Sequence, residues 1–365
     1  MTAIREVRAV YMRGGTSRCL IFHVGDLPPA GPARDHILLR ALGSPDPYGR
    51  QLDGMGGGIS SLSKACIIGP STHPEADVDY TFAQVDVRTP NVYYQGNCGN
   101  CSSAVGPFAI DEGLVRAKEP ETVVRIHNTN TNKRILARIP VVEGRAAAAG
   151  DFELPGVAGR GARIALDFLD PGGAVTGRLL PTGQVREMIG GVEASLVDAT
   201  NPIVFVRARD LGIAGTERPE TLDADRALVE RLEALRTEAA ERMGIPGGQA
   251  VPKIAMVAAP VDFTALDGTT VGADQTDVVA RVISMGNCHR AFALTAAMCL
   301  AVAARIQGTV VQECAARPSG DVRLGHPSGV LPIVATVELR EGRPHAVCAT
   351  VYRTARRLMA GLVSV

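Results

Sequence analysis

The sequence contains no tryptophan, and aromatic residues make up only 4% of its 365 positions. Its cores must therefore be built from alanine, valine, leucine and isoleucine instead of large rings. A net charge is also missing, since 38 basic residues balance 38 acidic ones. Without a basic excess, attraction to nucleic acid or to an anionic membrane surface has no electrostatic support. We therefore expect no nucleic-acid partner and no membrane partner.

Long apolar runs are absent as well. No stretch approaches the roughly 20 apolar residues that cross a bilayer, and the charged start 1–7 does not resemble a secretory signal. Several of the eight cysteines lie in apolar contexts, among them Cys66 and Cys299, which is typical of reduced thiols in a cytoplasmic protein. Cys98 and Cys101 form a C-x-x-C pair, but no second pair and no histidine stand at ligand spacing, so we expect no metal site.

The length of the chain suits two domains of roughly 150 to 200 residues. The glycine- and proline-rich stretch 170–183 is the best candidate for a boundary. We therefore expect a first domain over 1–183 and a second over 184–365, with a C-terminal strand that can return to the first domain. Short strands of alternating character predominate in both halves.

Each half also contains a glycine- and asparagine-rich turn that precedes a helix of small apolar residues. The pattern predicts central helices over about 98–116 and about 287–306. When the two halves of the chain are aligned on these turns, Cys98-Gly99-Asn100-Cys101 matches Met285-Gly286-Asn287-Cys288. The simplest explanation is a duplicated unit of about half the chain.

A second match supports the duplication. The segment that begins at Arg125 and its following strand resemble the segment that begins at Arg323 and its following strand. We therefore predict an α/β (α+β) fold of two similar domains, each a mainly antiparallel sheet wrapped around a central helix.

Three polar stretches could contact a ligand, and the first is 13–18, a Gly-Gly turn between two predicted strands. Its backbone N–H groups and the hydroxyls of Thr16 and Ser17 could converge on one carboxylate. A plain hairpin turn explains the same residues equally well.

The second stretch is the glycine-rich loop 53–63, which runs into Lys64 at the start of a predicted strand. Its residue order is not that of a P-loop, and a strand follows it instead of a helix. The loop could close over a small ligand with Lys64 pointing into the same space. A flexible loop with a surface lysine is the alternative.

The third stretch is the turn 95–98, which places Cys98 at the start of a buried helix. The first turn of a helix has unpaired N–H groups and the positive end of the helix dipole. A carboxylate or a thiolate is favoured there.

Several motifs along the chain are together highly specific. They are Met12-Arg13-Gly14-Gly15-Thr16-Ser17, Gly43-Ser44-Pro45-Asp46, Asp53-Gly54-Met55-Gly56-Gly57, Ser63-Lys64, Asp77-Val78-Asp79-Tyr80, Asn97-Cys98-Gly99-Asn100 and Gly325-His326-Pro327-Ser328-Gly329. Through them nearly the whole chain resembles the PrpF and methylitaconate isomerase family, which is related in fold to diaminopimelate epimerase and proline racemase.

The resemblance implies two similar α/β domains with the active site in the cleft between them. It also implies cofactor-independent proton transfer on a small unsaturated di- or tricarboxylate. Methylaconitate cis-trans isomerisation, a methylitaconate double-bond shift and oxalomesaconate tautomerisation all belong to this class. By the family motifs, Lys64 and Cys98 would transfer the protons.

We expect substrate-binding roles for residues that offer fixed donors to the carboxylates or to a dienolate. They are Arg13, Gly15, Thr16, Ser17, Gly57, Ser63, Asn97, Gly99, Asn100, Met285, Gly286, His289, His326 and Ser328. For His326, stabilisation of a tight Gly-His-Pro turn is an equally good explanation.

Two other classes of function remain. A two-thiol racemase or epimerase needs an acid and a base on opposite faces of a stereocentre, and Met285 cannot carry a proton. That class is disfavoured unless Cys288 has taken the role. A binding protein without chemistry would need neither Lys64 nor Cys98. The sequence leaves open which unsaturated acid is the substrate and whether the chain forms a homo-oligomer.

Overall fold

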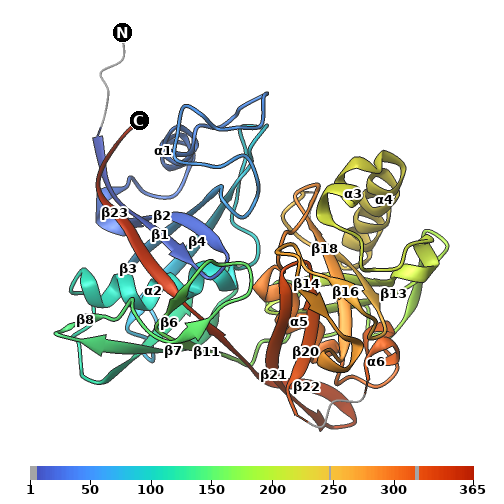
Figure 1. Ribbon diagram of the computed structural model, residues 1–365. Coiled ribbons are helices and arrows are strands. Elements are labelled where there is room, and N and C mark those ends of the chain that lie inside the picture. Colours follow the sequence, from blue (N-terminus) through green and yellow to red (C-terminus); the bar gives the residue numbers. More distant parts are fainter. Residues whose placement is uncertain (1–5, 246–247, 317–319) are drawn as a thin grey trace. The chain divides into compact units, whose positions relative to one another are not determined.

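A computed structural model describes residues 6–245, 248–316 and 320–365. The chain divides into two compact units, shown in Figure 1. Unit 1 consists of Met1–Leu166 and Tyr352–Val365, and unit 2 is Asp167–Val351. The first unit thus ends at Leu166 instead of the expected residue 183, and the C-terminal strand belongs to it.

Unit 1 is built around one sheet. The strands of the unit are β1 (Glu6–Gly14), β2 (Ser17–His23), β3 (Lys64–Pro70), β4 (Val78–Val85), β5 (Val92–Tyr93), β6 (Glu121–Asn128), β7 (Lys133–Val142), β8 (Arg145–Ala146), β9 (Phe152–Glu153), β10 (Arg160–Gly161) and β23 (Ala355–Ser364), and β11 (Ile164–Leu169) runs across the boundary. The strands β9 and β10 pair only with each other, in a small separate sheet. The order β23-β1-β2-β3-β4-β6-β7 is antiparallel except for the parallel pairs β2–β3 and β4–β6. Its helices are α1 (Pro32–Leu42), α2 (Gly99–Asp111) and the short 3-10 helix η1 (Val24–Asp26).

The central helix of unit 1 is α2, whose residues from Gly99 to Ile110 are all buried. It contacts β1, β2, β3, β4, β6, β7 and β23, so the sheet wraps around it, as Figure 1 shows. The helix is shorter than the predicted 98–116. Gly113 takes the left-handed conformation (φ 74°) directly after the C-cap, which ends the helix.

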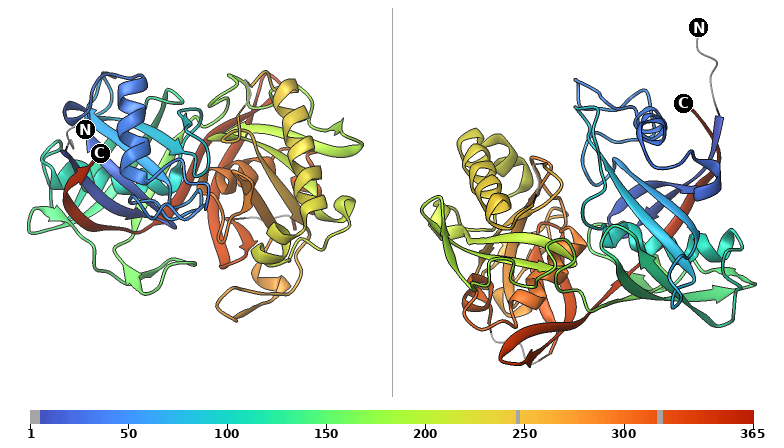
Figure 2. Two further views of the ribbon diagram at one scale, coloured as in Figure 1. Left: turned by 90° about the horizontal axis from the view of Figure 1, so that it is seen from above. Right: turned by 180° about the vertical axis from the view of Figure 1, so that it is seen from behind.

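The other face of this sheet packs against α1, which lies outside it in Figure 2. Leu20, Phe22 and Ala65 from the strands and Leu38 and Leu42 from α1 form this core. Because side chains alternate along a strand, the residues between these apolar positions point to the opposite face, toward α2.

Unit 2 has the same plan. Its strands are β12 (Glu187–Ile189), β13 (Val192–Ala199), β14 (Asn201–Arg207), β15 (Lys253–Ala258), β16 (Phe263–Thr264), β17 (Thr270–Val271), β18 (Val278–Ser284), β19 (Asn287–Cys288), β20 (Val322–His326) and β21 (Gly329–Arg340), and β22 (Arg343–Arg353) runs across the boundary. Its helices are η2 (Ala208–Leu211), α3 (Pro219–Ala224), α4 (Arg226–Arg242), η3 (Ala273–Gln275), α5 (Leu294–Ala303) and α6 (Val310–Cys314). The order β13-β14-β15-β18-β20-β21 repeats the alternation of antiparallel and parallel pairs found in β1-β2-β3-β4-β6-β7.

One ion pair recurs at the same place in both units. Asp77 accepts hydrogen bonds from the backbone N–H and the guanidinium of Arg125. Asp277 accepts the same set of bonds from Arg323. This correspondence confirms the predicted fold of two similar domains, each a sheet wrapped around a helix.

The second central helix begins later in the chain than the predicted residue 287. The helix α5 begins at Leu294 with Ala293 as its N-cap. Met285 and Gly286, with φ of 55° and 78°, form the two-residue turn of the hairpin β18–β19. Two successive positive φ values suit such a hairpin and exclude a helix start. The alignment of Cys98 with Met285 is therefore wrong, and by N-cap position Cys98 corresponds to Ala293.

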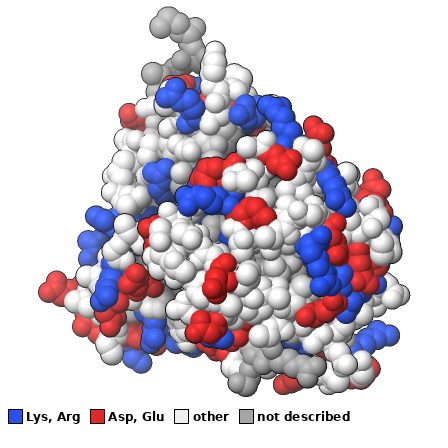
Figure 3. Space-filling view, turned by 45° about the vertical axis from the view of Figure 1, so that its right-hand side comes forward, with Lys and Arg blue, Asp and Glu red and all other residues white. Residues whose placement is uncertain are grey.

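No helix in the described ranges is long and apolar enough to cross a membrane. On the face drawn in Figure 3, basic and acidic side chains are interspersed, in agreement with the balanced composition.

Candidate active site

Lys64 is the first residue of β3, and its side chain is only 7% exposed. The amine donates a 2.6 Å hydrogen bond to Oε1 of Gln84, which stands opposite it on β4. It also lies 5.0 Å from the centre of the Phe82 ring. The amine is thus held in place between an amide oxygen and an aromatic face.

Gln84 connects this amine to the glycine-rich loop. Its Nε2 donates to the carbonyl oxygens of Ser60 (3.1 Å) and Ser63 (2.9 Å). The loop is held from its other side by Gln51, whose Nε2 donates to the hydroxyl of Ser63 and whose Oε1 accepts from the N–H of Gly58. The side-chain amides of Gln84 and Gln51 thus hold the loop in place. This arrangement disagrees with the alternative of a flexible loop with a surface lysine.

The strand register shows which way Lys64 points. Cys66, two residues along β3, lies on the same face as Lys64 because side chains alternate. The sulfur of Cys66 is within 4.8 Å of the sulfur of Cys101 in α2. Lys64 therefore points to the face of the sheet that α2 covers.

Cys98 stands at the start of this helix as its N-cap, and its side chain is 9% exposed. Its Sγ accepts a hydrogen bond from the N–H of Cys101 (3.5 Å). Tyr80, on the same face of β4 as Gln84, donates its hydroxyl to the carbonyl oxygen of Cys98 (3.3 Å). The helix dipole and the first-turn N–H groups favour an anion at this position.

The turn between β1 and β2 packs onto the same helix start. Asn100 donates its Nδ2 to the hydroxyl of Thr16 (3.1 Å), and its Oδ1 accepts from Nε of Arg353 (3.1 Å). A Cβ on Gly15, where φ is 52°, would lie 2.2 Å from Oδ1 of Asn100. Only glycine permits this close approach.

Arg353 is a buried cation without a carboxylate partner among the described residues. Burial lowers its pKa to about 9. Ser17, also buried, has a hydroxyl for which no partner occurs in the described part of the chain. Arg13, by contrast, donates to the backbone oxygens of Gly15 and Thr354, so its guanidinium holds the turn.

The remaining predicted residues of unit 1 lie in the same neighbourhood. Asn97 is buried and accepts a hydrogen bond from Ser102 in the first turn of α2. Gly57 faces Leu62 and Arg18, with 3.0 Å between its ideal Cβ and a guanidinium nitrogen of Arg18.

The predicted residues of unit 2 fall into two places. His326 is buried, and its Nδ1 accepts from the N–H of Ser328, whose hydroxyl donates to the carbonyl oxygen of Arg290. His289 precedes Arg290 and accepts at Nδ1 from the N–H of Ala291. Both imidazoles therefore stabilise local turns through Nδ1. Met285 and Gly286 lie in the β18–β19 hairpin turn described above.

Comparison with known proteins identifies the family. The model of the family described as "PrpF protein" matches residues 4–365. The chain belongs to the PrpF family. It is 43% identical to 3-methylitaconate isomerase of Eubacterium barkeri, covering 99% of this chain and 97% of the relative. It is 40% identical to 2-methyl-aconitate isomerase of Shewanella oneidensis, covering 99% and 97%.

A solved structure agrees with this assignment. The crystal structure of a methylitaconate-delta-isomerase matches 100% of this chain and 96% of its own, at 42% identity and a TM-score of 0.78. A further relative, 41% identical over 99% of this chain and 96% of the relative, is 4-oxalomesaconate tautomerase of Pseudomonas putida. The PrpF-family chain is therefore an isomerase.

In the described part of this PrpF-family isomerase, no thiol stands at the start of the second central helix. Ala293, the N-cap of α5, has no side chain that can carry a proton. Cys288 lies instead in β19, buried, and burial raises its pKa to about 12. A two-thiol mechanism has no support in these positions.

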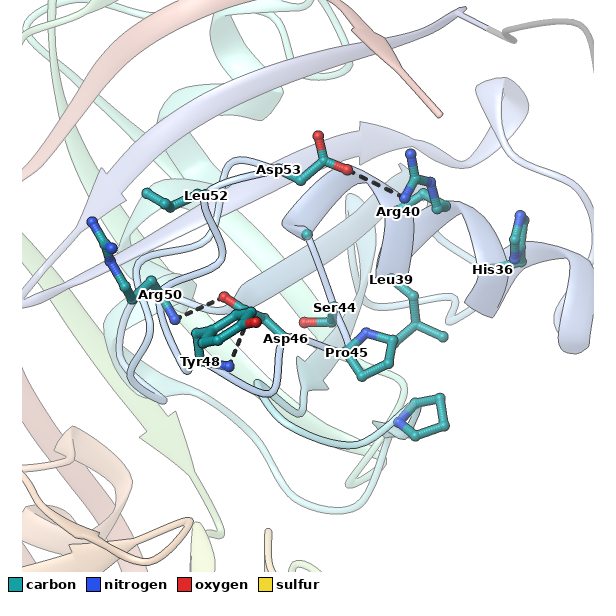
Figure 4. Close-up of a pocket in the computed structure, with 12 residues that line it drawn as sticks. His36, Leu39, Arg40, Ser44, Pro45, Asp46, Tyr48, Arg50, Leu52 and Asp53 are labelled. Atoms are coloured by element: carbon teal, nitrogen blue, oxygen red, sulfur yellow. Dashed lines mark hydrogen bonds and ion pairs between the residues drawn. The ribbon is translucent and has the colours of Figure 1, made fainter.

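A pocket of about 700 Å³ opens on unit 1, and neither Lys64 nor Cys98 is among the residues that line it. Figure 4 shows these lining residues. It is lined by His36, Leu39, Arg40, Gly43, Ser44, Pro45, Asp46, Tyr48, Arg50, Leu52, Asp53 and Pro90. Gln51 donates to the hydroxyls of both Ser44 and Ser63, so the wall of this pocket is bonded to the loop that precedes Lys64.

Sequence reasoning missed three residues that surround the predicted groups. Gln84 and Tyr80 share one face of β4 with Phe82, and a polar residue on a buried face was the available signal for Gln84. Arg353 gave no such signal, because only the tertiary fold brings it to Asn100, 253 residues away.

Proposed function

We propose that this PrpF-family isomerase shifts a carbon–carbon double bond in a small unsaturated di- or tricarboxylate, without a cofactor, by allylic proton transfer. The relatives named 3-methylitaconate isomerase and 2-methyl-aconitate isomerase support this substrate class. The observation that carries the proposal is the buried amine of Lys64, on the sheet face covered by α2, whose N-cap is the thiol of Cys98.

In the proposed reaction a base removes a proton from the allylic carbon, and the electron pair spreads into a dienolate. A proton then returns at the other end of the allylic system, so the substrate neither gains nor loses atoms. Lys64 and Cys98 act as the acid and base groups. General acid–base catalysis by one such group contributes about 10²- to 10⁴-fold.

Charge on the dienolate and on the substrate carboxylates needs fixed donors. Unit 1 offers donors of this kind in the first-turn N–H groups at Gly99 and Asn100 and in the hydroxyl of Ser17, which has no hydrogen-bond partner among the described residues. Arg353, a cation without a carboxylate, adds positive potential next to Asn100. The surroundings of Cys98 thus favour negative charge.

The relative named 4-oxalomesaconate tautomerase supports a second candidate, in which the same groups interconvert a keto and an enol form. Both candidates move a proton next to a conjugated carboxylate, and they differ in substrate.

Incubation in deuterated water with methylitaconate, methylaconitate, oxalomesaconate and a set of amino acids, followed by NMR, tests the proposal. Deuterium at an allylic carbon of the first or second acid is the expected result. Label only in oxalomesaconate would favour the tautomerase. Label at the α-carbon of an amino acid, or no label at all, would contradict the proposed reaction.

A further inference from the structure

Three more thiols meet beneath the start of α2. The sulfur atoms of Cys19 on β2, Cys66 on β3 and Cys101 on α2 all lie within 4.8 Å of one another, and each residue is 0% exposed. The proposed proton transfers use none of them. Sequence spacing gave no sign of this cluster, because it found only the pair Cys98 and Cys101 and therefore predicted no metal site.

Cys98 lies next to this cluster. The backbone N–H of Cys101, one helical turn further on, donates a 3.5 Å hydrogen bond to Sγ of Cys98. With 9% exposure, Cys98 is the least buried of the four cysteines. Cys98 is therefore the member of this set that lies nearest to solvent.

We propose that Cys19, Cys66, Cys101 and Cys98 form a binding site for one thiophilic metal ion of the Zn²⁺ or Cd²⁺ class. Four sulfur donors suit a closed tetrahedral site for such an ion. A zinc–sulfur bond of about 2.3 Å implies sulfur–sulfur separations of about 3.8 Å. The sulfur atoms of Cys19, Cys66 and Cys101 lie within 4.8 Å of one another, so small side-chain shifts bring these three to that value. The sulfur of Cys98 lies outside this group of three and must move further to become the fourth donor.

Binding is an exchange of protons for the ion. Each thiol that binds the ion releases its proton to solvent, and four thiolates around one divalent ion leave two negative charges on the complex. The amine of Lys64, on the same sheet face as Cys66, and the positive end of the α2 dipole offset these charges.

An ion that binds Cys98 withdraws the thiol assigned to proton transfer, so occupancy should stop turnover. This consequence rests on the proposed function, whereas binding of the ion does not. Ion binding and loss of turnover can be measured separately, because ion binding is detected in the absence of substrate.

The test is a titration of the reduced, metal-free full chain with Cd²⁺ alone, followed by the ultraviolet charge-transfer absorption of cadmium thiolate. Native mass spectrometry gives the stoichiometry. We expect one Cd²⁺ per chain. Cys19→Ser, Cys66→Ser and Cys101→Ser should each weaken binding by more than about 100-fold, since even second-shell partners of a metal contribute 10- to 100-fold. Cys348→Ser, which removes a partly exposed thiol of unit 2, is the control and should bind normally.

The absence of a cadmium–thiolate band in the wild-type protein would overturn the proposal. So would uptake that the three serine variants leave unchanged. Circular dichroism shows whether each variant folds. If the buried variants do not fold, Cys98→Ser should still weaken binding at least tenfold. Excess Cd²⁺ should also raise the wild-type Tm, because a ligand of the native state stabilises it. An unchanged Tm would count against the site.

Discussion

The amine of Lys64 and Oε1 of Gln84 are joined by a 2.6 Å hydrogen bond between directly opposed residues of β3 and β4. The amide of Gln84 cannot turn away, because its Nε2 donates to the carbonyl oxygens of Ser60 and Ser63. Gln84 therefore faces the amine with its amide oxygen and holds the glycine-rich loop with its amide nitrogen.

Replacing Gln84 by glutamate places a carboxylate beside the amine of Lys64. A neighbouring opposite charge favours the protonated form of an amine. We expect the rising limb of the pH–rate profile of Gln84→Glu to lie at higher pH than that of the wild type. Gln84→Leu, which only removes the hydrogen bonds, should lower kcat without such a shift. A Gln84→Glu profile equal to that of the wild type would exclude Lys64 from the rate-determining proton transfer.

Lys64→Met should abolish the proton transfer while leaving substrate binding largely intact. The thioether chain fills the buried volume, but it has no proton to exchange. Loss of one acid–base group lowers kcat by about 10²- to 10⁴-fold. Calorimetric binding and kcat are the two measurements. Lys118→Met, an exposed lysine beyond the other end of α2, is the control and should turn over normally. A near-normal rate for Lys64→Met would remove Lys64 from the mechanism.

Cys98→Ser separates catalysis from folding, because serine is a good N-cap and preserves the start of α2. The hydroxyl is a poor proton carrier near neutral pH, so we expect kcat to fall by about 10²- to 10⁴-fold. The double variant with Lys64→Met should be no slower than either single variant, since groups that act as a unit are not additive. Cys314→Ser serves as the control. Additive losses would mean that the two groups work independently.

The two turns that the sequence predicts to precede a helix show how much of the fold local sequence determines. Cys98 was placed correctly, because a glycine- and asparagine-rich turn does precede α2. The same composition at Met285 forms a hairpin turn, and φ values of 55° and 78° decide between the two outcomes. Local composition does not encode that choice. The pairing with the neighbouring strand does.

Contacts between distant segments of the chain could not be predicted from the sequence either. The hydrogen bond of Arg353 to Asn100 and the meeting of Cys19 with Cys66 and Cys101 depend on strand order, which a single sequence does not show. The sequence does single out Lys64 as a candidate site residue, because the signal is local: a lysine directly follows a glycine-rich loop.

Gly15→Ala tests the approach of the β1–β2 turn to the helix start. The new Cβ would lie 2.2 Å from Oδ1 of Asn100 and would also have to adopt a φ of 52°. Gly144→Ala is a matched control, because its φ is 71° and nothing lies within 4 Å. We expect the control to lose about 1 kcal/mol, the cost of backbone strain alone. Gly15→Ala should lose about 2 to 3 kcal/mol in urea unfolding and should lower kcat as well. Equal losses would show that the contact with Asn100 is unimportant.

The two repeated ion pairs provide an internal comparison of burial. The side chain of Asp277 is 7% exposed, whereas that of Asp77 is 21% exposed, and both accept the same bonds from an arginine. Solvent screening weakens an ion pair more strongly where its carboxylate is more exposed. Asp277→Ala should therefore reduce the free energy of unfolding by more than Asp77→Ala does.

The pH dependence of these variants has a definite sign. Burial raises the pKa of Asp277, but the hydrogen bonds from Arg323 outweigh it, so the pKa lies below its ordinary value. A carboxyl group with a lowered folded-state pKa stabilises the protein above its unfolded pKa of about 3.9, and this stabilisation is lost as the pH falls through the folded value. The difference between wild type and Asp277→Ala, measured by urea unfolding, should be constant from pH 7 to about pH 5 and shrink below about pH 4. A difference that persists unchanged at lower pH would assign the loss to packing instead of charge.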